Sequence, residues 1–438
     1  MIKNILKSLF LFLLVISSLV LTVLVWRYER DFSEVETSLT ALPNTGYGEQ
    51  VEFSQIIRPY QYVLIDGNEV NGTQDISAMN TALNTELSSS EVESLQMDTD
   101  LSSVDHVISD IDAQHFLILD FMTDIPVKTF LAAYGIDYEG FDPRGNLNRA
   151  IIDLQDNEAE LYLIDKSNQN TTFVNVEINS SAIIDILSSE QTSFERFSSI
   201  ITNSSNASRL TSIYSPSAPA SMNREMFISS MMSVEQLNQV MFLYNDYSSS
   251  NQNGITVYEN DQVATYYNNE TFRYLYQNKH EEESSSMNDH VTIRKNFDFL
   301  NSHRSMNSAS IIFDYNSDNS ELVLRESIDG KLVFSDEINN TTVVRDGIDE
   351  IYEFQRMQLR MSTQIPSQDS VELPNIETVR YDIANSDDLS LQFVTNFVLG
   401  YNMRFSEEQS ELNLVTFTPS WFILYDGEWM RYEEGGLN

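Results

Sequence analysis

The sequence predicts an α+β fold in which a single N-terminal transmembrane helix precedes an extracytoplasmic part of short helices and antiparallel sheets. Three observations lead to this prediction. Residues 8–26 form an uncharged apolar run, several apolar segments end at Asp-Gly turns, and Ser or Pro stands at the start of short helical patterns. The 438 residues leave room for two or three domains, each with its own core.

Residues 8–26, SLFLFLLVISSLVLTVLVW, are predicted to span a membrane. A helix of this length covers roughly 28 Å at 1.5 Å per residue, close to the thickness of a bilayer core. A cleaved signal peptide is the main alternative, because Lys3 and Lys7 form a basic start. The length of the run and the lack of a small-x-small cleavage site after it favour a retained helix.

The charges around this run favour a cytoplasmic tip at residues 1–7. Two lysines before the run are matched by Arg27 and Arg30 after it, so the local count does not decide the orientation. Beyond Arg30, only Arg58 interrupts a stretch without Lys or Arg that reaches residue 127. Nothing there holds the long segment in the cytoplasm, and we expect a single-pass protein of the cell membrane.

Ser18 and Thr22 are candidate contacts for a partner helix. They lie four residues apart and share a helix face with Leu11, Val15 and Val25. Small and hydroxylic side chains on one face permit close packing of two helices in a membrane. The alternative is that both hydroxyls bond the carbonyl groups of their own helix, and the pattern leaves both open.

Residues 42–46, LPNTG, match the pentapeptide that sortases cleave in Gram-positive wall proteins. A sorting signal is followed by an apolar span and a basic tail, whereas here the span precedes the pentapeptide and residues 47–438 follow it. Pro, Asn and Gly also form turns. We therefore interpret residues 27–48 as a juxtamembrane linker.

The first half of the remaining chain alternates strand and helix patterns. The predicted elements are strands in 51–67 before an Asp-Gly turn, one or two short exposed helices in 76–97, a buried strand in 113–121, a helix in 125–136 that begins near Pro126, an antiparallel meander in 149–178 and a helix in 180–190.

The second half begins after residues 202–225, which are rich in Ser, Asn and Pro and are the best candidate for a domain boundary or long connection. A helix is predicted in 233–243 with Ser233 as its N-cap. Hairpins are predicted in 255–267, in 322–336 with a turn at Asp329-Gly330, and in 420–432 with a turn at Asp426-Gly427.

Composition argues against several classes of function. The net charge is −41, and because residues 1–30 carry +3, residues 31–438 carry −41 − 3 = −44. Such a chain repels phosphate backbones, which argues against a nucleic-acid partner. Cysteine is absent, so disulfides and thiolate metal sites are excluded. No P-loop, GxGxxG, GxSxG or HExxH motif occurs.

Three acidic patterns resemble metal sites only in part. His280 and His290 share the acidic loop 280–290, where no helix or strand fixes their spacing. Residues 314–325 begin like a calcium loop, but Asn319 replaces its glycine and Arg325 its bidentate Glu, so we expect a polar turn between strands. The DxD patterns at 98–100 and 110–112 are expected by chance among 66 acidic residues. We expect no enzyme, cofactor or metal.

The two ends of the chain resemble the YycH family. Residues 2–26 have that family's basic start, a helix carrying SLVLT and a final aromatic residue. Near the carboxyl terminus, Leu373-Pro374, Gly400-Tyr401 and Pro419-Ser420-Trp421 occur in the family's order. The similarity in order and length covers the whole chain, although the middle has no signature and residues 27–30 lack the proline of many relatives.

This resemblance implies a membrane-anchored, non-enzymatic regulator. YycH proteins have three extracytoplasmic domains, which we place at 49–200, 201–310 and 311–438. With the related YycI protein they associate through their helices with the sensor histidine kinase WalK (YycG) of the WalK/WalR system, which controls cell-wall turnover. The kinase helix would then contact Ser18 and Thr22. The competing interpretation is an envelope binding or assembly module with an inert anchor and no kinase partner.

Overall fold

Short helices and many strands make up the folded part of the chain. The structure, a computed structural model, describes residues 48–437 apart from 89, 99–114, 155–157, 169, 189–192, 204–209, 219, 243–245, 285–287, 368, 406–413 and 434–435, together with Lys7, Leu14 and Ser18. Residues 45–438 form one compact unit and residues 1–44 another. The described helices are α2 (Phe53–Ile56), α3 (Ser77–Leu87), α5 (Val127–Ala133), α6 (Ser180–Leu187), α7 (Val234–Met241), α8 (Asp289–Ser302) and α9 (Ile376–Asn385).

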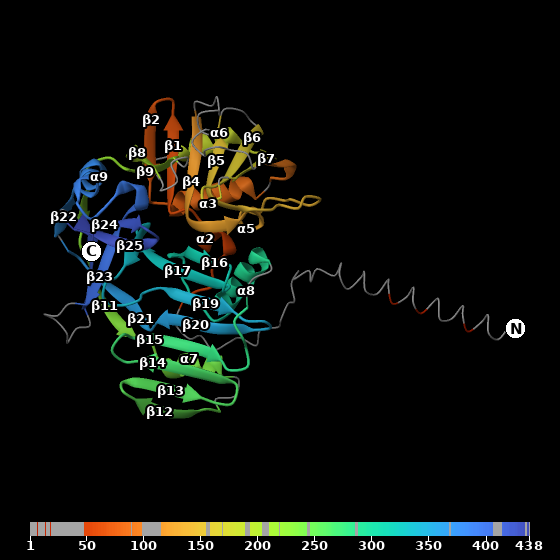
Figure 1. The fold of residues 1–438 in the computed structure, drawn as a ribbon, viewed down its shortest axis with the longest axis vertical. Coiled ribbons are helices and arrows are strands. Elements are labelled where there is room, and N and C mark those ends of the chain that lie inside the picture. Colours follow the sequence, from red (N-terminus) through yellow and green to blue (C-terminus); the bar gives the residue numbers. More distant parts are fainter. Residues whose placement is uncertain are drawn as a thin grey trace. The chain divides into compact units, whose positions relative to one another are not determined.

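The first sheet is antiparallel, with the strand order β3-β7-β6-β5-β4-β1-β2-β8-β9 (Figure 1). Its strands are β1 (Gln61–Asp66), β2 (Glu69–Thr73), β3 (Val92–Asp98), β4 (His115–Pro126), β5 (Asn146–Asp153), β6 (Glu158–Asp165), β7 (Asn170–Glu177), β8 (Glu195–Asn203) and β9 (Leu210–Pro216). Strands β4 to β7 pair in sequence order, each with the next. This part of the sheet is therefore a meander of local pairings.

Both faces of the first sheet are buried, because apolar residues occupy consecutive positions along its central strands. In β4, Leu117 and Leu119 pack in the same core as the apolar side chains of α3, α5 and α6. Their neighbours Phe116 and Ile118 point to the opposite face, where Phe197 of β8 covers them. The strand sequence therefore supplies two apolar faces, one for the helices and one for the β8–β9 hairpin.

The second sheet is larger and follows the path β12-β13-β14-β15-β20-β19-β17-β18-β23-β24-β11-β21, with β16 beside β17, β25 beside β24 and β26 beside β25. Its strands are β11 (Glu225–Met231), β12 (Ser248–Gln252), β13 (Ile255–Glu259), β14 (Val263–Asn268), β15 (Arg273–Asn278), β16 (Ser310–Asn316), β17 (Glu321–Ile328), β18 (Lys331–Phe334), β19 (Thr342–Asp346), β20 (Ile351–Met357), β21 (Leu359–Ile365), β23 (Val394–Phe405), β24 (Leu414–Tyr425), β25 (Glu428–Glu433) and β26 (Gly436–Leu437).

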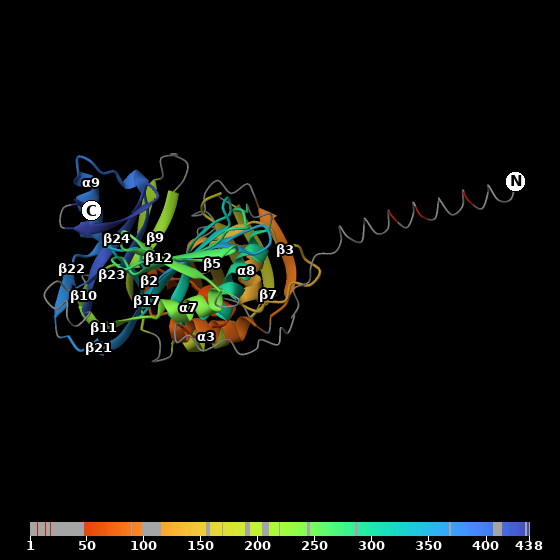
Figure 2. The same ribbon diagram turned by 90° about the horizontal axis from the view of Figure 1, so that it is seen from below.

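A small third sheet consists of β10 (Ala220–Asn223) and β22 (Ser370–Leu373). Helix α9 follows β22 and lies beside β23 and β24 (Figures 1 and 2). Its buried residues Ile376, Val379 and Ile383 share a core with Trp421 of β24. The indole Nε1 of Trp421 donates to the carbonyl oxygen of Pro374 at 2.9 Å, which fixes the start of the helix on the sheet.

The folded unit begins against helix α8. The backbone N–H of Glu49 donates to the carbonyl oxygen of Met306 at 3.1 Å, and that of Val51 donates to Oδ1 of Asn301 at 2.9 Å. The rings of Phe53 in α2 and Phe297 in α8 have centroids 5.0 Å apart. Residues about 250 positions apart in the sequence therefore hold the start of the unit in place.

A buried ion pair joins the central strands of the first sheet. Asp120 accepts hydrogen bonds from Nε of Arg149 at 2.6 Å and Nη2 at 3.1 Å, and both side chains are 1% exposed. Gln61 also donates to Asp120 at 3.0 Å, and Nζ of Lys166 lies 3.7 Å from it. Burial opposes the charged carboxylate, but Arg149 and Lys166 outweigh it and hold the pKa of Asp120 below its usual value.

Most predicted elements are confirmed. In 51–67, one strand is confirmed as β1, and the Asp-Gly turn after it leads into β2. The other confirmed elements are 113–121 as β4, 125–136 as α5, 149–178 as β5 to β7, 180–190 as α6 and 255–267 as β13 and β14. Ser233 caps α7, and its hydroxyl accepts from the N–H of Gln236 at 3.2 Å. At the tips of two hairpins, Asp329 and Asp426 have φ of 48° and 49°, as the predicted type I′ turns require.

Four predictions of local structure are wrong. Residues 53–56 form α2, because Gln55 Oε1 accepts from the N–H of Glu52 at 2.7 Å and caps a single turn. Residues 92–98 form strand β3, because they pair with β7. Helix α3 is not simply exposed, since Met79 and Leu83 are buried. His290 lies in α8 and not in a loop.

Two predictions about larger elements need correction in part. The long connection predicted in 202–225 is wrong, because these residues lie mostly in strands β8 to β11, apart from 204–209 and 219, which the structure does not describe. Although the segment is rich in Ser, apolar residues such as Ile213 pair with a neighbouring strand and are buried. The domain boundary predicted there stays a prediction. The second sheet is not purely antiparallel, because β18 and β23 run parallel with Leu332 opposite Gly400. The domain divisions at 49–200, 201–310 and 311–438 stay a prediction.

The predicted membrane span lies almost entirely outside the described residues. Leu14 and Ser18 are described, and both are helical and exposed. No helix in the described part of the chain is both long and apolar enough to cross a membrane. Thr22, the LPNTG pentapeptide and the two DxD patterns, except Asp98, are not described. The spanning helix at 8–26 and the linker at 27–48 therefore remain predictions.

Candidate ligand-binding cavity

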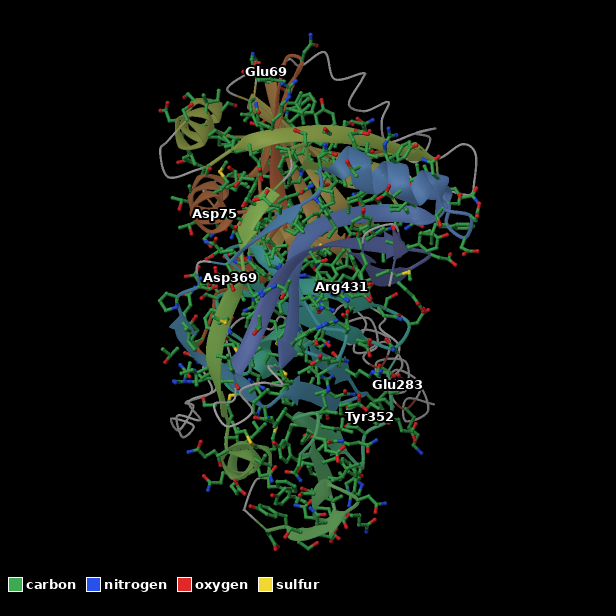
Figure 3. The ribbon with its side chains drawn as sticks, turned by 90° about the vertical axis from the view of Figure 1, so that its left-hand side faces the viewer. Glu69, Asp75, Glu283, Tyr352, Asp369 and Arg431 are labelled. Carbon is green, nitrogen blue, oxygen red and sulfur yellow. The ribbon has the colours of Figure 1, made fainter. Side chains whose placement is uncertain are left out.

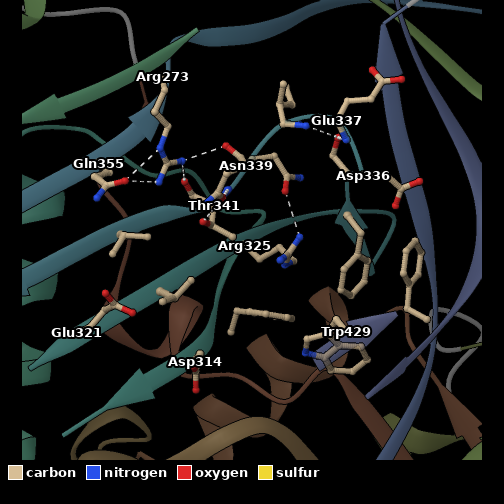
Figure 4. Close-up of a pocket in the computed structure, with 18 of the residues that line it drawn as sticks. Arg273, Asp314, Glu321, Arg325, Asp336, Glu337, Asn339, Thr341, Gln355 and Trp429 are labelled. Atoms are coloured by element: carbon tan, nitrogen blue, oxygen red, sulfur yellow. Dashed lines mark hydrogen bonds between the residues drawn. The ribbon is translucent and has the colours of Figure 1, made fainter. Parts of the chain in front are cut away.

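A cavity of about 630 Å³ lies in the second sheet, within the size range of small-molecule sites (Figure 4). Side chains of β15 to β20 form one side, the loop 335–341 forms another, and β24 and β25 close it. Arg431 of β25, labelled in Figure 3, is part of the lining. These strands are far apart in sequence, and the parallel pairing of β18 with β23 brings them together.

Aromatic rings line one wall of the cavity. Phe334 at the end of β18 stacks on Phe422 of β24 with ring centroids 3.9 Å apart. Trp429 of β25 lies 5.4 Å from Phe334, centroid to centroid. Gly400 makes this stack possible, since a Cβ there would lie 2.6 Å from the carbonyl oxygen of Leu332 and 3.2 Å from both phenylalanine rings. The Gly-Tyr pattern of the carboxyl-terminal region therefore has a steric role.

Arg325 of β17 lies over this aromatic wall. Its guanidinium carbon is 4.1 Å from the ring centroid of Phe313 and 4.4 Å from that of Phe334. Nη1 donates to the carbonyl oxygen of Val333 at 2.8 Å and to Oδ1 of Asn340 at 3.1 Å. Burial lowers the pKa of Arg325 to about 9, so the group stays charged at neutral pH. No carboxylate of the described residues lies within ion-pair distance of it.

Arg273 of β15 supplies a second positive charge to the cavity. Its Nη1 donates to the carbonyl oxygens of Asn339 at 3.0 Å and Thr341 at 2.7 Å, and its Nη2 donates to Oε1 of Gln355 at 2.8 Å. Burial lowers the pKa of Arg273 to about 10, and the charge of Glu353 opposes this shift only in part. Arg273 thus holds the loop 335–341 in place without a direct ion pair to any described residue.

Most acidic side chains of the lining have cationic neighbours. Asp336 lies 3.1 Å from a guanidinium nitrogen of Arg404 and 3.1 Å from one of Arg431. Glu321 lies 2.6 Å from Nε of Arg345. Among the arginines that line the cavity, only Arg273 and Arg325 therefore have no acidic partner in the described residues. The arrangement can hold a negatively charged group.

Of the two partner-helix residues predicted from sequence, Ser18 is not among the residues that line this cavity, and Thr22 lies outside the described residues. Nδ1 of His290 in α8 lies 3.1 Å from the Thr129 hydroxyl, and burial lowers its pKa to about 4 together with the charges of Lys128 and Arg294. Within the described ranges, no group of three or more His, Cys, Asp or Glu could hold a metal ion.

In the sequence, Arg325 is notable only as a mismatch to a calcium loop. The predicted polar turn is confirmed, since residues 317–320 connect β16 to β17. The available signal was an arginine inside the apolar strand run LVLRE. Its environment could not be read from sequence, because Phe313 and Phe334 reach it only through the sheet.

The fold and this cavity can now be set beside known proteins. Residues 4–192 match the model of the YycH protein, N-terminal domain, and residues 210–435 match that of the YycH protein, C-terminal domain. The chain belongs to the YycH family. This membership supports a regulatory role in the YycG/WalK system in general.

One solved structure has a similar fold over most of the chain. The crystal structure of YycH from Bacillus subtilis is 16% identical, with a TM-score of 0.69, and the match covers 88% of this chain and 98% of that chain. An uncharacterized protein from Eubacterium rectale gives 10% identity and a TM-score of 0.32, covering 52% and 90% of the two chains. The Bacillus megaterium YpeB C-terminal domain gives 12% identity and a TM-score of 0.26, covering 46% and 91%. No curated protein matches the sequence significantly.

Proposed function

We propose that this protein is a non-enzymatic regulator of the sensor histidine kinase WalK (YycG) that acts from the cell membrane together with a YycI-like partner. The observation that carries the proposal is the pair of YycH family matches at residues 4–192 and 210–435, which together extend over most of the chain. The similarity in fold to YycH from Bacillus subtilis supports it. The folded unit lies outside the cell in this proposal, with residues 1–7 in the cytoplasm.

Regulation would pass through the helix at residues 8–26. Ser18 and Thr22 lie on one face of this helix and would permit close contact with a helix of the kinase. A regulator shifts the kinase between its states only if it binds one state better than the other. The folded unit would bias this choice by setting the orientation of the helix at its membrane end.

The first test is purification of the kinase with this protein from the native membrane. The full-length chain is compared with a version in which residues 8–26 are replaced by an unrelated spanning helix. We expect the kinase to accompany the full-length chain and to be lost from the helix-replaced version. Absence of the kinase from both preparations would refute the proposal and leave an envelope binding or assembly module.

Single substitutions then test the helix face. Ser18→Leu and Thr22→Leu fill the predicted contact, and each is expected to reduce the amount of co-purified kinase several-fold. Ser17→Leu is the matched control, since the same change occurs about 100° around the helix from Ser18. Equal loss with Ser17→Leu and Ser18→Leu would mean that no particular face is recognised.

A further inference from the structure

The cavity in the second sheet combines two guanidinium groups that have no carboxylate partner among the described residues with an aromatic wall. We propose that it binds a small organic carboxylate, whose carboxylate group contacts Arg325 and whose flat apolar part packs against Trp429 (Figure 4). This site is separate from the helix that the proposed function uses. It would give the folded unit a chemical ligand of its own.

The charge balance of the cavity is the first argument. Acidic residues outnumber basic ones 66 to 25 in this chain, yet neither Arg325 nor Arg273 has a carboxylate of the described residues within ion-pair distance. A charge that is removed from water without a partner is destabilising. Burial lowers the pKa of both groups because it disfavours their charged forms. A bound anion would stabilise these charged forms.

The hydrogen bonds of Arg325 leave one nitrogen of its guanidinium group available. Nη1 donates to Val333 and Asn340, which fixes the plane of the group. Nε has no acceptor, but it is buried and out of reach of a ligand, whereas Nη2 makes no hydrogen bond to a described residue and is not buried. A carboxylate oxygen that accepts from Nη2 would form a charge-assisted hydrogen bond, which is stronger than a bond between neutral groups.

The aromatic wall favours an organic ligand over a simple inorganic anion. Trp429 lines the cavity, and its ring lies 5.8 Å from Phe313 and 5.4 Å from Phe334. Such rings offer a flat apolar face for stacking. Asp336 and Glu337 also line the cavity, and their charges disfavour a dianion such as phosphate more than a singly charged carboxylate. A cavity of about 630 Å³ accommodates a small organic acid.

The experiment compares two probes that differ only in charge. N-acetylphenylalanine carries a carboxylate, and N-acetylphenylalaninamide is its neutral counterpart. Binding of each to the full-length chain in one detergent is measured by ligand-observed NMR, and inorganic phosphate is added as a competitor. We expect the acid to bind at least about tenfold more tightly than the amide, since the charge-assisted contact to Arg325 is lost in the amide. Phosphate should not displace it.

Variants then assign the preference to Arg325. Arg325→Gln should abolish the difference between acid and amide, and Arg325→Lys should retain part of it, because lysine keeps the charge without the planar fork. Arg144→Gln, which removes an exposed arginine from the loop before β5, is the matched control and should bind like the unchanged chain. Near-UV circular dichroism checks that each variant is folded.

Several outcomes would overturn the proposal. Equal binding of acid and amide to the unchanged chain would show that charge is not recognised, and failure of the acid to bind at millimolar concentration would show that the cavity does not take such a ligand. Displacement by phosphate would indicate a general anion site without an organic component. A preference that survives in folded Arg325→Gln would place the contact elsewhere.

Discussion

Replacing Asp120 by Asn should destabilise the first sheet strongly. The carboxylate receives two hydrogen bonds from Arg149, at 2.6 and 3.1 Å, with both side chains 1% exposed. Each bond to a charged group contributes about 1.5–3 kcal/mol, so two give about 3–6 kcal/mol. Asparagine keeps one acceptor but leaves the buried guanidinium without a counter-charge. We therefore expect a loss of about 3–5 kcal/mol in the free energy of unfolding, the range for breaking a buried pair.

An exposed ion pair provides the matched control. Asp142 lies 2.7 Å from a guanidinium nitrogen of Arg144, with side chains 70% and 79% exposed. The same change, Asp142→Asn, should cost less than about 1 kcal/mol because water screens the charges. The comparison separates the effect of burial from the effect of losing a carboxylate.

The assay must report on the first sheet directly. Trp421 and Trp429, the tryptophans of the described part of the chain, both lie in the second sheet, so fluorescence follows the other half of the unit. Hydrogen exchange of β4 and β5, measured by mass spectrometry, should become faster in Asp120→Asn, with a lower urea midpoint by circular dichroism. An effect no larger than that of Asp142→Asn would refute the reasoning.

A double variant and the pH dependence complete this test. Asp120→Leu combined with Arg149→Met removes both charges of the pair and should be less destabilised than Asp120→Asn, because the buried guanidinium is no longer left without a counter-charge. The folded pKa of Asp120 lies below its unfolded value of about 3.8. Its contribution is therefore fully present above that value and is lost as the pH falls through the lower folded pKa.

Three further changes test other parts of the structure. The pKa of His290 is lowered from 6.5 to about 4, so the free energy of unfolding should fall as the pH drops between these values. His290→Gln should make the urea midpoint less dependent on pH in that range. An unchanged pH dependence in the variant would contradict this. Gly400→Ala should cost about 1–3 kcal/mol by urea denaturation, because its Cβ would lie 2.6 Å from the Leu332 carbonyl oxygen, and a neutral result would rule the contact out. Trp421→Phe should lower the fluorescence-detected urea midpoint, because the partly buried Pro374 carbonyl loses its donor at 2.9 Å. An unchanged midpoint would show that this hydrogen bond does not contribute to stability.

Local chemistry explains why much of the fold could be predicted from sequence. The Asp-Gly pairs at 329–330 and 426–427 need positive φ at both positions, and the structure gives them that conformation. Ser233 caps a helix because its hydroxyl reaches an N–H three residues on. These features depend on neighbours in the chain. Such turns and caps can be predicted from sequence wherever the fold keeps the conformation that the local residues prefer.

Long-range pairing explains what could not be predicted. Strand β3 was mistaken for helix, because its conformation depends on pairing with β7 and not on its own composition. Helix α8 was not predicted, although Ile293, Phe297 and Leu300 repeat at helical spacing. The acidic, Ser-rich residues just before it indicated a loop. The cavity was missed entirely, since the partners of Arg325 come from separate strands. Only assembly of the sheet defines that site.

The attachment of residues 48–53 to α8 determines how mechanical load enters the folded unit. Glu49 and Val51 are bonded to Met306 and Asn301, at the carboxyl-terminal end of α8, before the chain reaches β1. A pull or twist arriving along the chain from residue 47 would be carried first by α8 and the strands beneath it. Strand β1, which begins at residue 61, would not bear this load directly, although it is the first strand of the folded unit. Tension would therefore be borne by residues from the middle of the chain, so the amino-terminal sheet would not be the first part to unravel.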